Sequence, residues 1–64
     1  MLYTIRVTQQ FICNERVTGY LAQDLTLLDD IDGAGTFELG HVAELIESLD
    51  YVGCQLIDCQ IAVA

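Results

Sequence analysis

The stretch LYTIRVTQQFIC, at residues 2–13, decides the fold because apolar and polar side chains alternate along it. A period of two is typical of a β-strand with one buried face. We therefore expect a strand here, followed by a turn at residues 14–16. The side chains expected in the core are Tyr3, Ile5, Val7, Phe11 and Cys13, and those expected on the other face are Thr4, Arg6, Thr8 and Gln10.

Two further stretches have the same character. Residues 55–63 alternate again, with Ile57, Cys59, Ile61 and Val63 expected on one face and Asp58 and Gln60 on the other. Residues 17–28 are ambiguous. Residues 17–21 fit the return strand of a hairpin with a bulge at Gly19, whereas Leu21, Leu25 and Leu28 have helical spacing. We expect a strand through Leu21 and then a short helical or irregular piece.

An amphipathic helix is expected after the loop at residues 29–36. Its apolar stripe consists of Leu39, Val42, Leu45, Ile46 and Leu49, and its polar arc of His41, Glu44, Glu47 and Ser48. Thr36 is the expected N-cap, Glu38 complements the positive end of the helix dipole, and Gly53 suits a left-handed C-terminal position.

Together these elements predict a small α+β domain over residues 1–64. Its antiparallel sheet has three strands (ββαβ, order 2-1-3), and one amphipathic helix packs on one face. Apolar residues make up 53% of the chain, which is more than so short a chain can bury. We therefore expect an apolar surface for a partner or for a homodimer. A dimer is expected to join through the less acidic N-terminal strand.

The charge restricts the classes of partner. The chain has ten Asp and Glu residues but only two basic residues, Arg6 and Arg16, and its net charge is −8. Such a surface repels phosphates, so direct binding to nucleic acid or to anionic membranes is not expected, and a cationic protein partner is favoured. There is no apolar run of about 18 residues and no signal-peptide pattern, so we expect a cytoplasmic protein with reduced thiols.

Catalytic and metal chemistry are not indicated by the cysteines or the histidine. Cys54 and Cys59 are five residues apart, which places them on opposite faces of a regular strand, and zinc requires three or four convergent ligands. Cys13 and Cys59 are interpreted as small core side chains, and His41 as part of the polar arc. The acidic surroundings disfavour a reactive thiolate. We expect no enzyme activity, no metal and no cofactor.

The segment DIDGAGTFELGH, at residues 30–41, resembles the calcium loop of the EF-hand family. Asp30, Asp32, Gly35 and Glu38 match positions 1, 3, 6 and 9 of that loop, but Ala34 and His41 replace oxygen ligands at positions 5 and 12. The main interpretation is an acidic loop that leads into a helix. The resemblance implies a degenerate, calcium-responsive module as an alternative.

Seven carboxylates are the candidate partner-binding residues: Asp29, Asp30, Asp32, Glu38, Glu44, Glu47 and Asp50. The first four are expected around the N-terminal end of the helix, and the whole set on one side of the molecule. This face either keeps the protein soluble or occupies a groove shaped for phosphates.

In size, charge and architecture the chain resembles small acidic inhibitors of phages and mobile elements, anti-CRISPR proteins among them. The resemblance implies a nucleic-acid mimic that blocks a basic surface of a nucleic-acid-handling host protein. A structural homo-oligomer is the other alternative.

Overall fold

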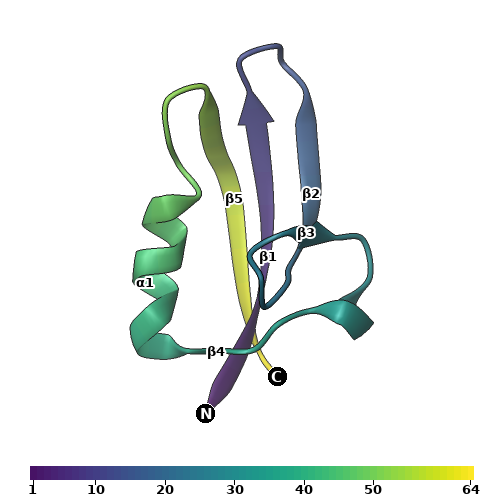
Figure 1. Cartoon of the computed structure of the whole chain (residues 1–64), viewed down its shortest axis with the longest axis vertical. Helices are drawn as coiled ribbons and strands as arrows, with labels where there is room; N and C mark the ends of the chain where they lie inside the picture. Colours follow the sequence, from purple (N-terminus) through teal and green to yellow (C-terminus); the bar gives the residue numbers. More distant parts are fainter.

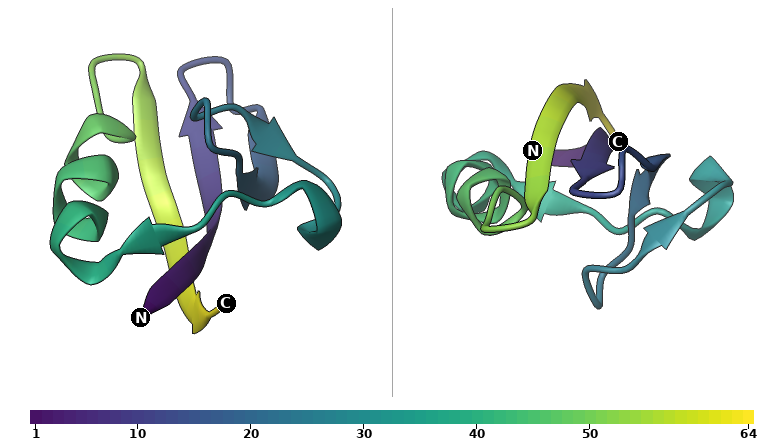
Figure 2. Two further views of the ribbon diagram at one scale, coloured as in Figure 1. Left: turned by 60° about the horizontal axis from the view of Figure 1, so that its bottom comes forward. Right: turned by 90° about the horizontal axis from the view of Figure 1, so that it is seen from above.

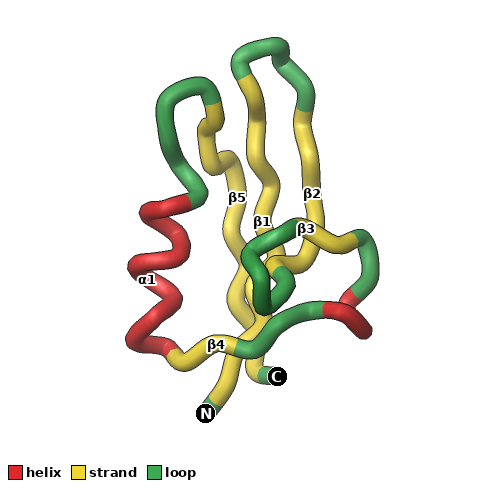
Figure 3. The backbone as a smooth tube through the Cα atoms, in the orientation of Figure 1, coloured by secondary structure: helices red, strands yellow, loops and turns green.

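The computed structural model describes residues 1–64 as an antiparallel sheet of five strands with one helix (Figures 1 and 3). The α+β class is therefore confirmed. The elements in chain order are β1 (Leu2–Phe11), β2 (Arg16–Leu21), β3 (Leu27–Leu28), the 3₁₀ turn η1 (Ile31–Gly33), β4 (Phe37–Glu38), α1 (Leu39–Ser48) and β5 (Cys54–Val63). At ten residues, α1 is too short to cross a membrane.

β1 lies in the middle of the sheet and is hydrogen-bonded along both edges. One edge pairs with β5 from Tyr3 to Phe11. The other pairs with β2 and, near the start of the strand, with β4; β2 in turn carries β3. The three long strands follow the expected order β2-β1-β5. The three-stranded topology is nevertheless not matched exactly, because β3 and β4 add two short strands.

The position of β1 excludes edge-to-edge pairing of two copies through this strand. Both of its edges are occupied within the molecule, so it offers no free edge to a second copy. Among the three long strands, β5 is an edge strand, because it pairs only with β1.

The molecule has two layers, because only one face of the sheet is covered. Ile5 and Val7 of β1 are fully buried and pack with Leu21, Phe37 and Val42 in the core. Residues 22–53 form the covering layer, with α1 at one side of it and η1 at the other (Figure 2). Side chains at the even positions of β1 point the other way, so they form an open face.

The amphipathic helix is confirmed, with two corrections. Val42 is buried and Leu45, Ile46 and Leu49 pack against the core, but Leu39 is 61% exposed. Thr36 is not the N-cap. The helix begins after Glu38, whose side chain makes no capping hydrogen bond. The backbone of Thr36 instead exchanges two hydrogen bonds with the side chain of Gln23, at 3.2 and 3.4 Å.

Both hairpins of the sheet use three-residue loops that end on a residue with positive φ. In the first loop this is Asn14 (φ 67°), and Asn14 N donates to Phe11 O at 2.8 Å. In the second it is Leu25 (φ 70°), and Leu25 N donates to Ala22 O at 2.9 Å. Asparagine tolerates this conformation, whereas leucine is strained in it. The helical interpretation of Leu21, Leu25 and Leu28 was therefore wrong.

β5 contains the irregularity of the sheet. Thr8 pairs with Asp58 and Gln9 with Leu56, so Ile57 is an extra residue in a β-bulge. The bulge returns Leu56 and Cys54 to the covered face and leaves Ile57 exposed. One expectation was therefore wrong: Cys54 and Cys59 lie on the same face.

Three local expectations also need correction. Cys13 is exposed in the first hairpin loop and is not part of the core. Gly19 is not at a bulge, because it pairs regularly with Val7 and lies close to the backbone of Leu28. Gly53 does have positive φ (90°), but it lies in the turn before β5, since the helix ends earlier, with Leu49 as its C-cap.

Gly35 shows why the covering layer requires a glycine. It is buried, and its N donates to Leu21 O at 2.9 Å. A Cβ atom at this position would lie 2.6 Å from Gln23 N and 2.9 Å from the carbonyl carbon of Ala22. Because these contacts are to backbone atoms, a side chain at this position would force the loop that contains Gly35 away from the end of β2.

We predict that Gly35→Ala lowers the free energy of unfolding by about 1–3 kcal/mol, as overpacking does. Gly40→Ala is the matched control. Gly40 lies in α1 with open space around it, so alanine should raise the free energy by about 0.5–1 kcal/mol. Urea unfolding followed by circular dichroism measures both. Equal effects of the two changes would contradict the proposed backbone contact.

Candidate functional site

The covering layer carries most of the negative charge, and we call residues 22–53 the acidic layer. Eight of the ten carboxylates lie in it: Asp24 and the seven candidate residues of the sequence. The other two are Glu15, in the first hairpin, and Asp58, on β5. All seven candidate residues are exposed.

Both arginines lie on the open face of the sheet, away from the acidic layer. Arg6 is at an even position of β1, between Tyr20 and Gln60 of the neighbouring strands. Arg16 pairs with Gln10 in the same face, and Arg16 Nε donates to Gln10 Oε1 at 3.2 Å. The two layers therefore differ in charge.

Within the acidic layer the carboxylates form two groups. Glu38, Glu44, Glu47 and Asp50 belong to α1 or adjoin it, and we call them the helix group. Asp29, Asp30 and Asp32 belong to η1 or adjoin it, and we call them the turn group. The views in Figures 1 and 2 place α1 and η1 at opposite sides of the layer. The expectation that the turn group surrounds the start of the helix was therefore wrong.

The helix group faces water because the opposite side of α1 packs on the sheet. Glu44 and Glu47 are three residues apart, so their Cβ atoms lie about 5–6 Å from each other on one helix face. Val42 and Ile46, on the other side of the helix, contact the core. The arrangement presents paired negative charges with no cation of this chain in the same layer.

The turn group does not adopt the arrangement of an EF-hand loop. Asp30 is the N-cap of η1, and its Oδ1 accepts from Asp32 N at 3.1 Å. Glu38, the last matching ligand, has left the loop for strand β4, and strand β3, not a helix, precedes the segment. No three His, Cys, Asp or Glu side chains come together as metal ligands.

Gln9 fixes the end of α1 to the centre of the sheet. It is 6% exposed, and its Nε2 donates to Leu49 O at 2.8 Å. The thiol of Cys54 donates to the same carbonyl at 3.7 Å. Sequence reasoning missed Gln9. The available signal was its place at an odd position of β1, where a polar side chain requires a buried partner.

Asp24 differs from the other carboxylates because it stabilises its own turn. Its Oδ1 accepts from the Thr26 hydroxyl at 2.7 Å and from Thr26 N at 3.2 Å. These hydrogen bonds lower the pKa of Asp24 below 3.8. They hold the loop that contains the strained Leu25, so Asp24 has a local structural role.

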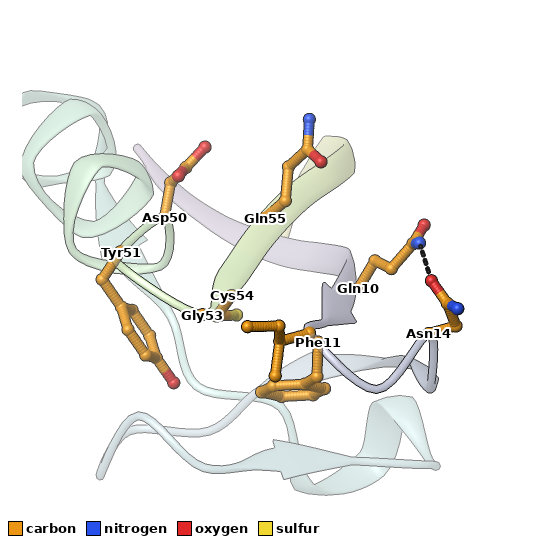
Figure 4. A pocket seen from close by; sticks show the side chains of 9 residues that line it. Gln10, Phe11, Asn14, Asp50, Tyr51, Gly53, Cys54 and Gln55 are labelled. Carbon is orange, nitrogen blue, oxygen red and sulfur yellow. Dashed lines mark hydrogen bonds between the residues drawn. The ribbon is translucent and has the colours of Figure 1, made fainter.

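An open pocket of about 350 Å³ lies where the first hairpin loop meets the turn before β5 (Figure 4). Ile12 N donates to Gly53 O at 3.1 Å and joins the two segments. The thiol of Cys54 beside it raises the pKa of Tyr51 above 10.0. Cys54 also lines the pocket, but its thiol is engaged with Leu49 O. The other groups that line the pocket are amide side chains, the Asp50 carboxylate, Tyr51 and the apolar side chains of Phe11 and Ile12.

Comparison of the chain with protein-family models, curated proteins and solved structures finds no match. The proposed function therefore rests on the geometry and charge of this molecule.

We predict that Gln9→Met lowers the free energy of unfolding by about 1–3 kcal/mol, because it removes the buried donor to Leu49 O and keeps the side-chain volume. The control is Gln10→Met on the open face, where the change should stay within about 0.5 kcal/mol. Urea unfolding measures both. A neutral Gln9→Met would mean that the hydrogen bond does not hold α1.

A second prediction concerns Cys59. Burial, and to a smaller extent Asp58, raise the pKa of the Cys59 thiol above 9.0. The folded state thus resists ionisation more than the unfolded state does. The contribution of the neutral Cys59 thiol to the free energy of unfolding is therefore fully present below pH 9.0. It should be lost as the pH rises toward the raised pKa of the folded state.

Unfolding in urea at about pH 8 and pH 10 tests this. The alkaline loss of stability should be smaller in Cys59→Ala than in the unchanged chain, whereas Cys13→Ala, at an exposed position, should leave it unaltered. The same loss in both variants would assign it to other groups.

Proposed function

We propose that this chain is a non-enzymatic binding protein whose acidic layer covers a basic surface of a nucleic-acid-handling protein. The observation that carries the proposal is the separation of charge between the two layers. Eight carboxylates lie in the acidic layer, and both arginines lie on the opposite, open face of the sheet. A surface that binds phosphates is complementary to such a layer.

Solubility alone does not require this separation. Carboxylates on either face of the sheet would raise the net charge equally and keep the protein dispersed. Here the open face carries Asp58 and, beside Leu2 at its margin, Glu38, together with Thr8, Thr18 and both arginines. This asymmetry orients a basic partner, because the partner is attracted to the acidic layer and repelled by the arginines of the open face.

The helix group is the proposed centre of the contact. Glu44 and Glu47 lie on a regular helix whose end is fixed to the sheet by Gln9, so little side-chain and backbone freedom is lost on binding. The turn group lies at the other side of the layer and widens the contact. The class of partner, and the relation to phage-type inhibitors, follow from charge and size and belong to the proposal.

The test compares three double charge reversals that change the net charge equally. Glu44→Lys with Glu47→Lys alters the helix group, and Asp29→Lys with Asp32→Lys alters the turn group without removing the Asp30 cap. Glu15→Lys with Asp58→Lys is the control outside the layer. Each protein is immobilised, and retention of basic, nucleic-acid-binding proteins from a lysate is measured along a salt gradient.

The helix-group variant should lose retention, with binding weakened about tenfold or more, because several charge pairs are replaced by like-charge contacts. The turn-group variant should lose less retention, and the control should retain its partner. Equal loss of retention in all three variants would show that only the net charge matters. Retention that is insensitive to salt and to all three changes would refute the proposal.

A further inference from the structure

The side of β5 that faces away from β1 is an unpaired edge of the sheet. β5 has ten residues, and its only strand partner is β1. In Figure 1, α1 lies beside β5 on the side away from β1, and no other strand lies there. Proteins usually blunt such an edge with charges, proline or a bulge, because its free N–H and C=O groups pair with other strands.

Only half of this edge is protected. The bulge at Ile57 distorts the first half, and the strand contains no proline and a single charge, Asp58. From Asp58 to Val63 the pairing with β1 is regular. Ala64 N donates to Leu2 O, so by strand alternation the N–H and C=O groups of Cys59, Ile61 and Val63 point away from β1.

The apolar side chains of the core extend from β1 to β5, where they become exposed. Ile5 of β1 is fully buried, whereas Ile61, its partner on β5, is 42% exposed. Val63, opposite Tyr3, is 62% exposed. An apolar row that begins in the core is thus left open to water on the side where the backbone is unpaired.

We propose that the half-edge Cys59–Val63 pairs with the same segment of a second copy, antiparallel and centred on Ile61. Ile61 then lies opposite Ile61, and Cys59 opposite Val63. The two sheets become continuous, and the two exposed Ile61 side chains cover each other. The second copy is the occupant that fits because this strand, unlike the acidic layer, is nearly free of charge.

The one charged side chain of β5 does not prevent this contact. In this register each Asp58 lies opposite residue 64, so the two Asp58 carboxylates are about 20 Å apart along the strands. That is more than twice the screening length of about 8 Å at physiological ionic strength. Salt should strengthen the dimer by screening the remaining repulsion, whereas it weakens the binding of a basic partner by the acidic layer.

The test is sedimentation equilibrium from about 10 µM to about 1 mM protein, at low and moderate salt. The unchanged chain should dimerise, and more strongly at moderate salt. Ile61→Lys places two like charges at the symmetry axis and should weaken dimerisation about tenfold or more. Ile57→Lys is the matched control, because its exposure, strand and charge change are the same but it lies outside the paired segment.

A synthetic chain with an N-methyl group on Ile61 tests the backbone contact with the side chain intact. It removes two hydrogen bonds per dimer and should weaken dimerisation about tenfold to a hundredfold. N-methylation of Val52, in the exposed turn, should have no effect. A monomer at all concentrations, or equal effects of the Ile61 changes and their controls, would overturn the proposal. Neither outcome bears on the acidic layer.

Discussion

The structure depends on the pairing of β1 along both edges. This strand is bonded to β2 and β4 on one side and to β5 on the other, so every strand except β3 is attached to it directly. Its Ile5 and Val7 supply two of the three fully buried side chains in a core of five buried residues. Gln9, on the same face, adds the hydrogen bond that fixes the end of α1. One alternating stretch thus provides sheet, core and helix anchor.

The charge separation follows from this arrangement. The strands alternate, so apart from Gln9 the polar side chains of the long strands lie on the open face, and there they are mostly Thr, Gln and Arg. The covering layer has more exposed positions, because its loop and the outer arc of α1 do not contact the sheet. Carboxylates occupy these positions with no cation nearby, so they repel one another. Solubility alone does not require this repulsion, and binding to a basic surface would offset it.

The sequence predicted those parts of the fold that repeat a simple period. The alternation of residues 2–11 and the stripe from Val42 to Leu49 identified β1 and α1, because burial of one face imposes a period of 2 or 3.6. The misses are positions where a local interaction overrides the period. The extra residue at Ile57 shifts the alternation of β5, and Leu25 accepts a strained backbone because the turn holds it.

The candidate site was predictable in composition but not in arrangement. The seven carboxylates are exposed as expected, since ionised groups rarely become buried without partners. Their division into two groups was not foreseeable, because it depends on β4. This two-residue strand pairs with Leu2 and Tyr3 and carries the chain from η1 across to α1. A strand that short leaves no periodic signal in the sequence.

The two proposed surfaces are compatible because they occupy different parts of the molecule. Antiparallel pairing of two identical edge strands relates the sheets by a twofold axis perpendicular to them, so both acidic layers lie on the same side of the continuous sheet. A dimer thus presents two helix groups in one direction and both open faces in the other. A partner with an extended basic groove then meets twice the number of carboxylates. The second contact becomes intramolecular once the first has formed, which raises the overall affinity without any new type of interaction.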